Sequence, residues 1–89
     1  GLYGPEDSIT REQFATILWR YAGSPASTHS LDHFTDADQI SGYARQAMAW
    51  ANEHGIVNGM GDGRLAPKGT ALRSQVAQML MNFCKYMTK

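Results

Sequence analysis

The stretch TREQFATILWRYAG, residues 10–23, contains a complete amphipathic helix together with its start and stop signals. Its apolar residues recur at the three- and four-residue spacing of a helix with one buried face. Thr10 and Gln13 form a capping box, in which each side chain satisfies a backbone N–H of the other residue. Gly23 ends the pattern. We therefore predict a helix near residues 11–22. Its apolar positions are Phe14, Ala15, Ile17, Leu18, Tyr21 and Ala22.

The same pattern returns 62 positions later, from Arg11 to Arg73, as LRSQVAQMLMNFCK. Such an internal repeat indicates a tandem array whose units bury their apolar faces against one another. We assign residues 1–23 to the C-terminal half of a first unit, 24–33 to a linker and 34–89 to a complete second unit. The identical pairs are Gly1 and Gly63, Pro5 and Pro67, Arg11 and Arg73, Gln13 and Gln75, Ala15 and Ala77, and Leu18 and Leu80.

Two further helices are expected, near residues 41–54 and 73–86. Ser41 is placed to cap the first of them, while the second begins after Leu72, which has no side-chain acceptor. Trp50 falls on the apolar stripe of the first helix and is expected in the core. In the third helix the expected stripe is Val76, Leu80, Phe83 and Met87, and Cys84 is expected as a buried thiol.

The segment NGMGDG, residues 58–63, requires a tight turn with positive φ values. No segment alternates apolar and polar residues as a half-buried strand would. The expected fold class is all-α: a helix–loop–helix tandem repeat with tight Gly/Asp-rich turns at 23–33 and 55–70, and little or no strand.

Composition excludes several classes of function. The chain has 89 residues, of which eight are basic and eight acidic. A balanced charge supplies neither the basic surface of a nucleic-acid-binding protein nor a polybasic face for membranes. Because no apolar run approaches the roughly 20 residues that span a bilayer, we expect no membrane insertion. The single cysteine, Cys84, excludes an internal disulfide.

Catalytic and metal-binding motifs are also missing from the sequence. No nucleophile–base pair or carboxylate pair occurs as a local motif, so we expect no enzymatic activity. An EF-hand loop starting at Asn58 would place Met60 and Gly69 where carboxylates are required. The three histidines and Cys84 lack zinc-site spacing. We expect no cofactor and no metal.

Several motifs follow one another in a fixed order. The second unit opens with Phe34-Thr35-Asp36, contains AMAWA at 47–51 and reaches GIVNGMGDG at 55–63, and the first unit contains ITREQ at 9–13. This order resembles the S-layer homology domain family. The resemblance implies an extracellular, non-catalytic module on the bacterial cell wall that binds an acidic, pyruvylated-type secondary cell-wall polysaccharide. It also implies neighbouring repeats as partners, since three such repeats usually form a pseudo-threefold unit with glycan grooves between them.

The candidate ligand contacts follow from the chemistry of the motifs. Arg11, at a helix start, offers a planar fork to a carboxylate, and Arg73 repeats it. The turn around Asp62 lets the backbone approach a sugar, and its carboxylate can accept bonds from sugar hydroxyls. Trp19 lies off the core stripe, where it covers a neighbouring repeat or lines a sugar groove. The candidate glycan-binding residues are Thr10, Arg11, Trp19, Gly61, Asp62, Gly63 and Arg73.

A second class of function stays open: a structural or protein–protein interaction repeat that has lost glycan binding. Leu72, where the family pattern has threonine, favours this alternative, whereas the intact pair Thr10-Arg11 favours glycan binding. Either way, one and a half repeats leave the faces around Trp19 and Met81 without their usual neighbours. Because exposed apolar patches favour association, we expect the chain to self-associate or to exchange half-units.

Overall fold

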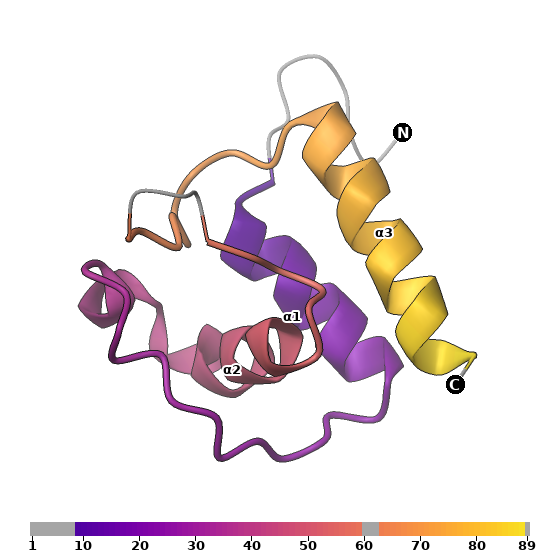
Figure 1. The fold of residues 1–89 in the computed structure, drawn as a ribbon, viewed down its shortest axis with the longest axis horizontal. Helices are drawn as coiled ribbons and strands as arrows, with labels where there is room; N and C mark the ends of the chain where they lie inside the picture. The colour runs from indigo at the N-terminus through magenta and orange to yellow at the C-terminus, as the bar shows by residue number, and fades with distance from the viewer. Residues whose placement is uncertain (1–8, 60–62, 89) are drawn as a thin grey trace.

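The computed structural model of the chain describes residues 9–59 and 63–88. Over these residues the β structure is one isolated antiparallel bridge, between Thr10 and Thr70. The expected all-α class is therefore confirmed. No helix in the described ranges is long and apolar enough to cross a membrane. The elements, shown in Figure 1, are α1 Arg11–Tyr21, η1 Ala37–Gln39, η2 Gly42–Ala44, α2 Arg45–Glu53 and α3 Arg73–Met87.

The helices pack around one core to which both units contribute. Trp50, at the centre of α2, is almost fully buried, as predicted. Its ring meets Phe83 and Tyr86 of α3 edge-on, with centroids 6.1 and 5.3 Å away. Helix α1 contributes to the same core. The core residues are Phe14, Ala15 and Leu18 of α1, Met48, Trp50 and Ala51 of α2, Met79 and Phe83 of α3, and Ile40, Ala44, Ile56, Val57 and Leu65 between the helices.

Several positions that the helical period places in the core are on the surface instead. Tyr21 is 77% exposed, Leu80 42% and Met87 48%. Cys84 is also exposed, so its prediction as a buried thiol was wrong. These four residues line an open apolar groove of about 440 Å³ between α1 and α3. The helical period identifies an apolar face, but whether that face is covered depends on a neighbouring element.

The starts of the helices differ in how their free N–H groups are satisfied. At α1 the predicted capping box is present: Gln13 N donates to Thr10 Oγ1 at 3.2 Å, and Thr10 N to Gln13 Oε1 at 2.9 Å. At α3 the N-cap is Leu72, whose N–H donates to Gln75 Oε1 at 2.9 Å, while its own side chain caps nothing. The predicted 41–54 helix is split into η2 and α2, and Ser41 makes no capping bond.

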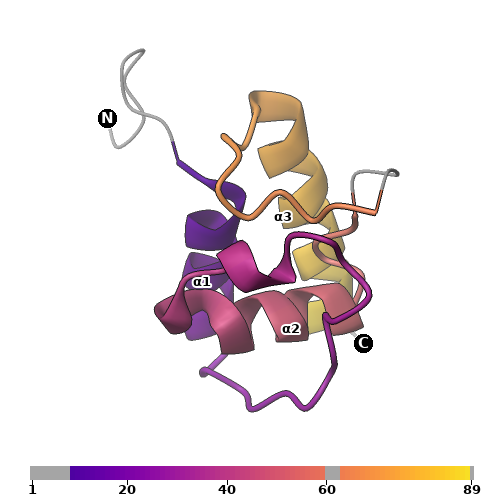
Figure 2. The same cartoon turned by 90° about the vertical axis from the view of Figure 1, so that its left-hand side faces the viewer.

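The linker 24–33 leaves the end of α1 and runs along the outer side of α2 (Figures 1 and 2). It is tied down at Ser27, whose N–H donates to Gln46 Oε1 at 2.8 Å and whose hydroxyl donates to Glu53 Oε1 at 2.8 Å. The chain then enters η1 and η2 before α2. Its path places the first unit's helix directly against the second unit.

Candidate glycan-binding site

Arg11 reaches from the first turn of α1 into the loop that connects α2 to α3. Its side chain is only 6% exposed. Nε donates to the Leu65 carbonyl at 3.1 Å, and Nη2 donates to the Asn58 carbonyl at 2.7 Å. Burial lowers the pKa of Arg11, and the nearby charge of Asp36 partly opposes this effect. Arg11 thus holds the loop between α2 and α3 at two carbonyl groups, those of Asn58 and Leu65.

Asp36 holds the same loop from the other side. Its carboxylate is buried and accepts the N–H groups of Leu65 and Ala66, both at 2.8 Å. Leu65 is therefore fixed by Arg11 at its carbonyl and by Asp36 at its N–H. The loop also passes close to Phe34, because a Cβ added at Gly59 would lie 2.7 Å from the Phe34 ring. The motifs FTD and TR thus converge on one loop.

A small pocket of about 130 Å³ lies beside Arg11, between this loop and α3. Three residues with amide side chains, Gln75, Gln78 and Asn82, line it from α3. Amides both donate and accept hydrogen bonds, which suits sugar hydroxyls, while a guanidinium suits a carboxylate. The full lining is Arg11, Ile56, Val57, Asn58, Gln75, Gln78, Met79 and Asn82.

The other candidate residues lie outside this lining. Thr10 is committed to the capping box, and the Trp19 Nε1–H donates to the Pro25 carbonyl at 2.7 Å. Gly63 has a φ of +86°, as the predicted turn requires, and its carbonyl accepts the Thr35 N–H at 2.8 Å. Arg73 is exposed, and its side chain makes no hydrogen bond or ion pair within the described residues. The Gly61-Asp62 part of the prediction lies outside the described residues.

Glu12 is a buried charged residue that the sequence analysis did not single out. It is 2% exposed, and Oε1 accepts the Ser41 N–H at 3.0 Å. Oε2 accepts the hydroxyls of Ser41 at 2.6 Å and Tyr43 at 3.1 Å, and the Lys68 ammonium at 3.2 Å. Burial raises the pKa of Glu12, but these bonds outweigh burial and lower it overall. Burial and the neighbouring Glu12 carboxylate raise the pKa of Tyr43.

Helix α1 packs on the elements that follow the linker, and the side chains of Arg11 and Glu12 bond to residues of those elements, which defines a small all-helical module with one shared core. The family model described as "S-layer homology domain" matches residues 33–77, and the chain belongs to this family.

Relatives confirm the assignment. The chain is 37% identical over 81 residues to an amylopullulanase of Thermoanaerobacterium thermosulfurigenes, an alignment covering 85% of this chain and 4% of that protein. It is 35% identical over 81 residues to exoglucanase XynX of Acetivibrio thermocellus, covering 85% and 7%. It is 30% identical over 82 residues to S-layer protein EA1 of Bacillus anthracis, covering 92% and 9%. No solved structure matches the chain.

The chain thus spans less than a tenth of the length of these relatives. Its family consists of non-catalytic modules that attach proteins to the bacterial cell wall. Family membership therefore supports cell-wall anchoring and a location at the bacterial cell surface.

Proposed function

We propose that the chain anchors a larger protein to the bacterial cell wall by binding an acidic, pyruvylated-type secondary cell-wall polysaccharide. The observation that supports this proposal is the pocket beside Arg11, which combines a guanidinium with amide side chains of α3. A guanidinium has five N–H donors. Within the described residues, Arg11 uses two of them to bind the carbonyls of Leu65 and Asn58, which leaves donors for a carboxylate.

Arg11 has two roles in this proposal. It holds the loop at Asn58 and Leu65, and it offers its remaining donors to the acidic substituent of a sugar. Gln75, Gln78 and Asn82 contact the sugar hydroxyls. Thr10 positions the helix start. The residues Gly61, Asp62, Gly63, Trp19 and Arg73 stay candidates for further contacts along the polymer.

The test is calorimetric titration with pyruvylated secondary cell-wall polysaccharide, and with the same polymer after mild acid has removed its pyruvate. We expect binding that is lost with the pyruvate. Arg11→Ala should weaken binding about 10- to 150-fold, since it removes a charge-assisted contact. Arg11→Lys should recover only part of this loss, because an ammonium lacks the planar fork.

Because Arg11 also supports the loop, a pocket residue with no such structural role is needed. Gln78 is exposed, lines the pocket and donates to Asn82 Oδ1 of the same helix at 3.1 Å rather than to the loop. Gln78→Ala should therefore weaken binding about 2- to 10-fold, with helicity measured to check α3. Gln39→Ala, which removes an exposed amide far from α3 in sequence, is the matched control. If folded Arg11→Lys and Gln78→Ala both bind like the parent chain, this site is the wrong one.

The alternative is a structural or protein–protein interaction repeat, and one observation favours it. At α3 the repeat-equivalents of the residues at the α1 start are Leu72, Arg73 and Ser74, which lack the cap and the carboxylate. A parent chain that ignores both forms of the polymer but binds a protein containing adjacent repeats would support this second function.

A further inference from the structure

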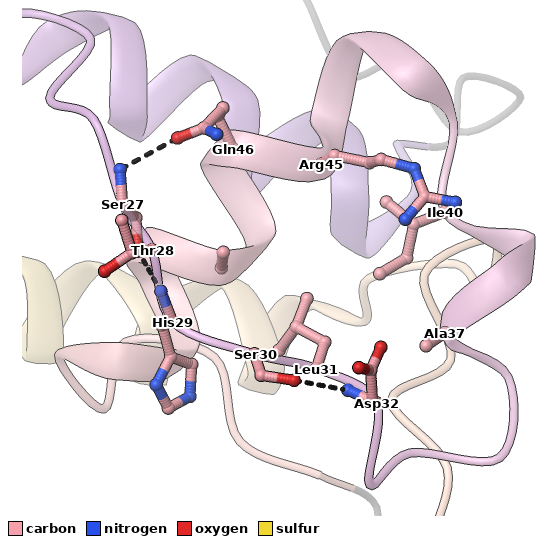
Figure 3. A pocket seen from close by; sticks show the side chains of 11 residues that line it. Ser27, Thr28, His29, Ser30, Leu31, Asp32, Ala37, Ile40, Arg45 and Gln46 are labelled. Carbon is pink, nitrogen blue, oxygen red and sulfur yellow. Dashed lines mark hydrogen bonds between the residues drawn. The ribbon is translucent and has the colours of Figure 1, made fainter.

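A second pocket lies between the linker and the first turns of α2 (Figure 3). The linker is held there by several bonds. Beyond the two bonds of Ser27, the His29 Nε2 lies 2.8 Å from Asn52 Oδ1, and Asp32 N donates to Ser30 Oγ at 3.2 Å. Residues 27–32 therefore form a fixed wall rather than a loose connection.

The pocket measures about 300 Å³, at the lower end of the range for small-ligand sites. This volume suits one sugar residue better than an oligosaccharide. Its apolar surface comes from Leu31, Ala37, Ile40 and Ala49, of which Ile40 and Ala49 are buried. Polar side chains surround this apolar floor. Such a combination fits a pyranose ring, which has an aliphatic face and a rim of hydroxyls.

Two charged side chains flank the pocket. Figure 3 shows Arg45 extending from α2 beside Ile40, and the Asp32 carboxylate pointing from the linker toward the same space. Within the described residues neither side chain makes a hydrogen bond or an ion pair. Arg45 thus has its whole guanidinium fork available for a carboxylate, and Asp32 can accept bonds from hydroxyls.

We propose that this pocket is a second subsite for one acidic sugar residue, with Arg45 binding the carboxylate and Asp32 the hydroxyls. The inference rests on the proposed function, since the sugar belongs to the same cell-wall polymer. The pocket shares no lining residue with the one beside Arg11. Two subsites on one chain would let separate sugar residues of one polymer bind with a combined affinity above that of either.

The experiment titrates pyruvylated cell-wall polysaccharide into the parent chain, Arg45→Gln and Arg20→Gln. Arg20→Gln is the matched control, because Arg20 is an exposed arginine at the last turn of α1. Arg45→Gln should weaken binding about tenfold, and Arg20→Gln should leave it unchanged. Arg45→Lys should recover part of the affinity. Circular dichroism checks that each variant keeps its helices.

A second measurement locates the site directly. Adding glucuronic acid, a single acidic sugar, should shift the backbone amide resonances of residues 27–32 and Gln46 in the parent chain but not in Arg45→Gln. Failure of the parent chain to bind the polymer would overturn the proposed function. In that case the resonance shifts caused by glucuronic acid would support the subsite, and their absence would overturn it. If the parent binds the polymer while Arg45→Gln binds equally well, or Arg20→Gln loses as much, the subsite is overturned and the proposed function stands.

Discussion

Arg11 and Glu12 are adjacent in the sequence, and both side chains leave their own half-unit to enter the second unit. Burying a charged side chain costs free energy, because the charge loses its hydration. Such residues are found in protein interiors when hydrogen bonds or ion pairs compensate for that loss. Arg11 was predicted as a ligand contact from its place at a helix start, but its bonds to the loop could not be predicted. Its acceptors, Asn58 and Leu65, lie 47 and 54 positions away and leave no local pattern. Glu12 likewise could not be predicted to be buried, because an acidic residue is common in the first turn of a helix. The hint in the sequence is that its i+3 and i+7 neighbours, Ala15 and Trp19, are apolar.

Glu12 should make the folded chain sensitive to acid. Because its folded-state pKa lies below the unfolded value of about 4.3, its contribution is complete above that pH and is lost as the pH falls through the folded pKa. Glu12→Gln should lower the free energy of unfolding by about 2 kcal/mol at pH 7. The difference between the variant and the parent chain should shrink as the pH falls below about 4.3 and disappear below the folded pKa of Glu12.

The measurement is urea unfolding between pH 3 and pH 7. Asp38→Asn is the control, because Asp38 is an exposed acid without a hydrogen bond within the described residues. A constant difference between Glu12→Gln and the parent chain at every pH would contradict the assigned role.

The helices α1 and α3 occupy equivalent positions in the repeat but have different environments. Their bounds were predicted closely, because helical period and capping signals are local features of the sequence. The predicted second helix was less accurate, since Ser41 donates its hydroxyl to Glu12 instead of capping a helix. That competition is a tertiary contact, and a helix pattern alone does not contain it.

A cap at α3 should stabilise the chain. Leu72 is the N-cap and is 59% exposed, so Leu72→Thr should gain a side-chain cap at little cost in burial. The expected gain is about 1 kcal/mol. Thermal unfolding monitored by circular dichroism checks it, with Leu72→Ala as the control that removes leucine without adding an acceptor. Equal midpoints for the threonine and alanine variants would show that no cap forms.

At the scale of the whole molecule, the buried apolar residues could be predicted from the sequence better than the exposed ones. The core could be predicted in part, because Trp50 and Phe83 lie where the apolar period places them. On the surface, Leu80 and Met81 of α3 are 42% and 54% exposed. At the equivalent positions of α1, Leu18 is buried in the core and Trp19 is partly buried against it. A sequence pattern records that a face is apolar but not which chain supplies the covering helix.

We therefore expect the chain to self-associate through α3. Light scattering at high concentration should give a mass above the 9.8 kDa of one chain. Replacing Leu80 and Met81 together by glutamine should shift the population toward the monomer, and the exposure of both positions keeps the cost to folding small. Gln39→Ala, away from this face, should associate like the parent chain. A monomeric parent chain at high concentration would contradict this expectation.

The bridge between Thr10 and Thr70 has a consequence for how the chain folds during synthesis. The N–H groups of Arg11 and Glu12, at the start of α1, donate to the carbonyls of Gly69 and Pro67 at 2.9 and 3.0 Å. These acceptors lie 58 and 55 positions after their donors, so they leave the ribosome long after the start of the helix that they complete. Contacts of such sequence separation form late, since a long loop must close first. The N–H groups at the start of α1 therefore lack these acceptors until residues 67–69 have been synthesised. We expect α1 and the later elements to fold together in one cooperative step.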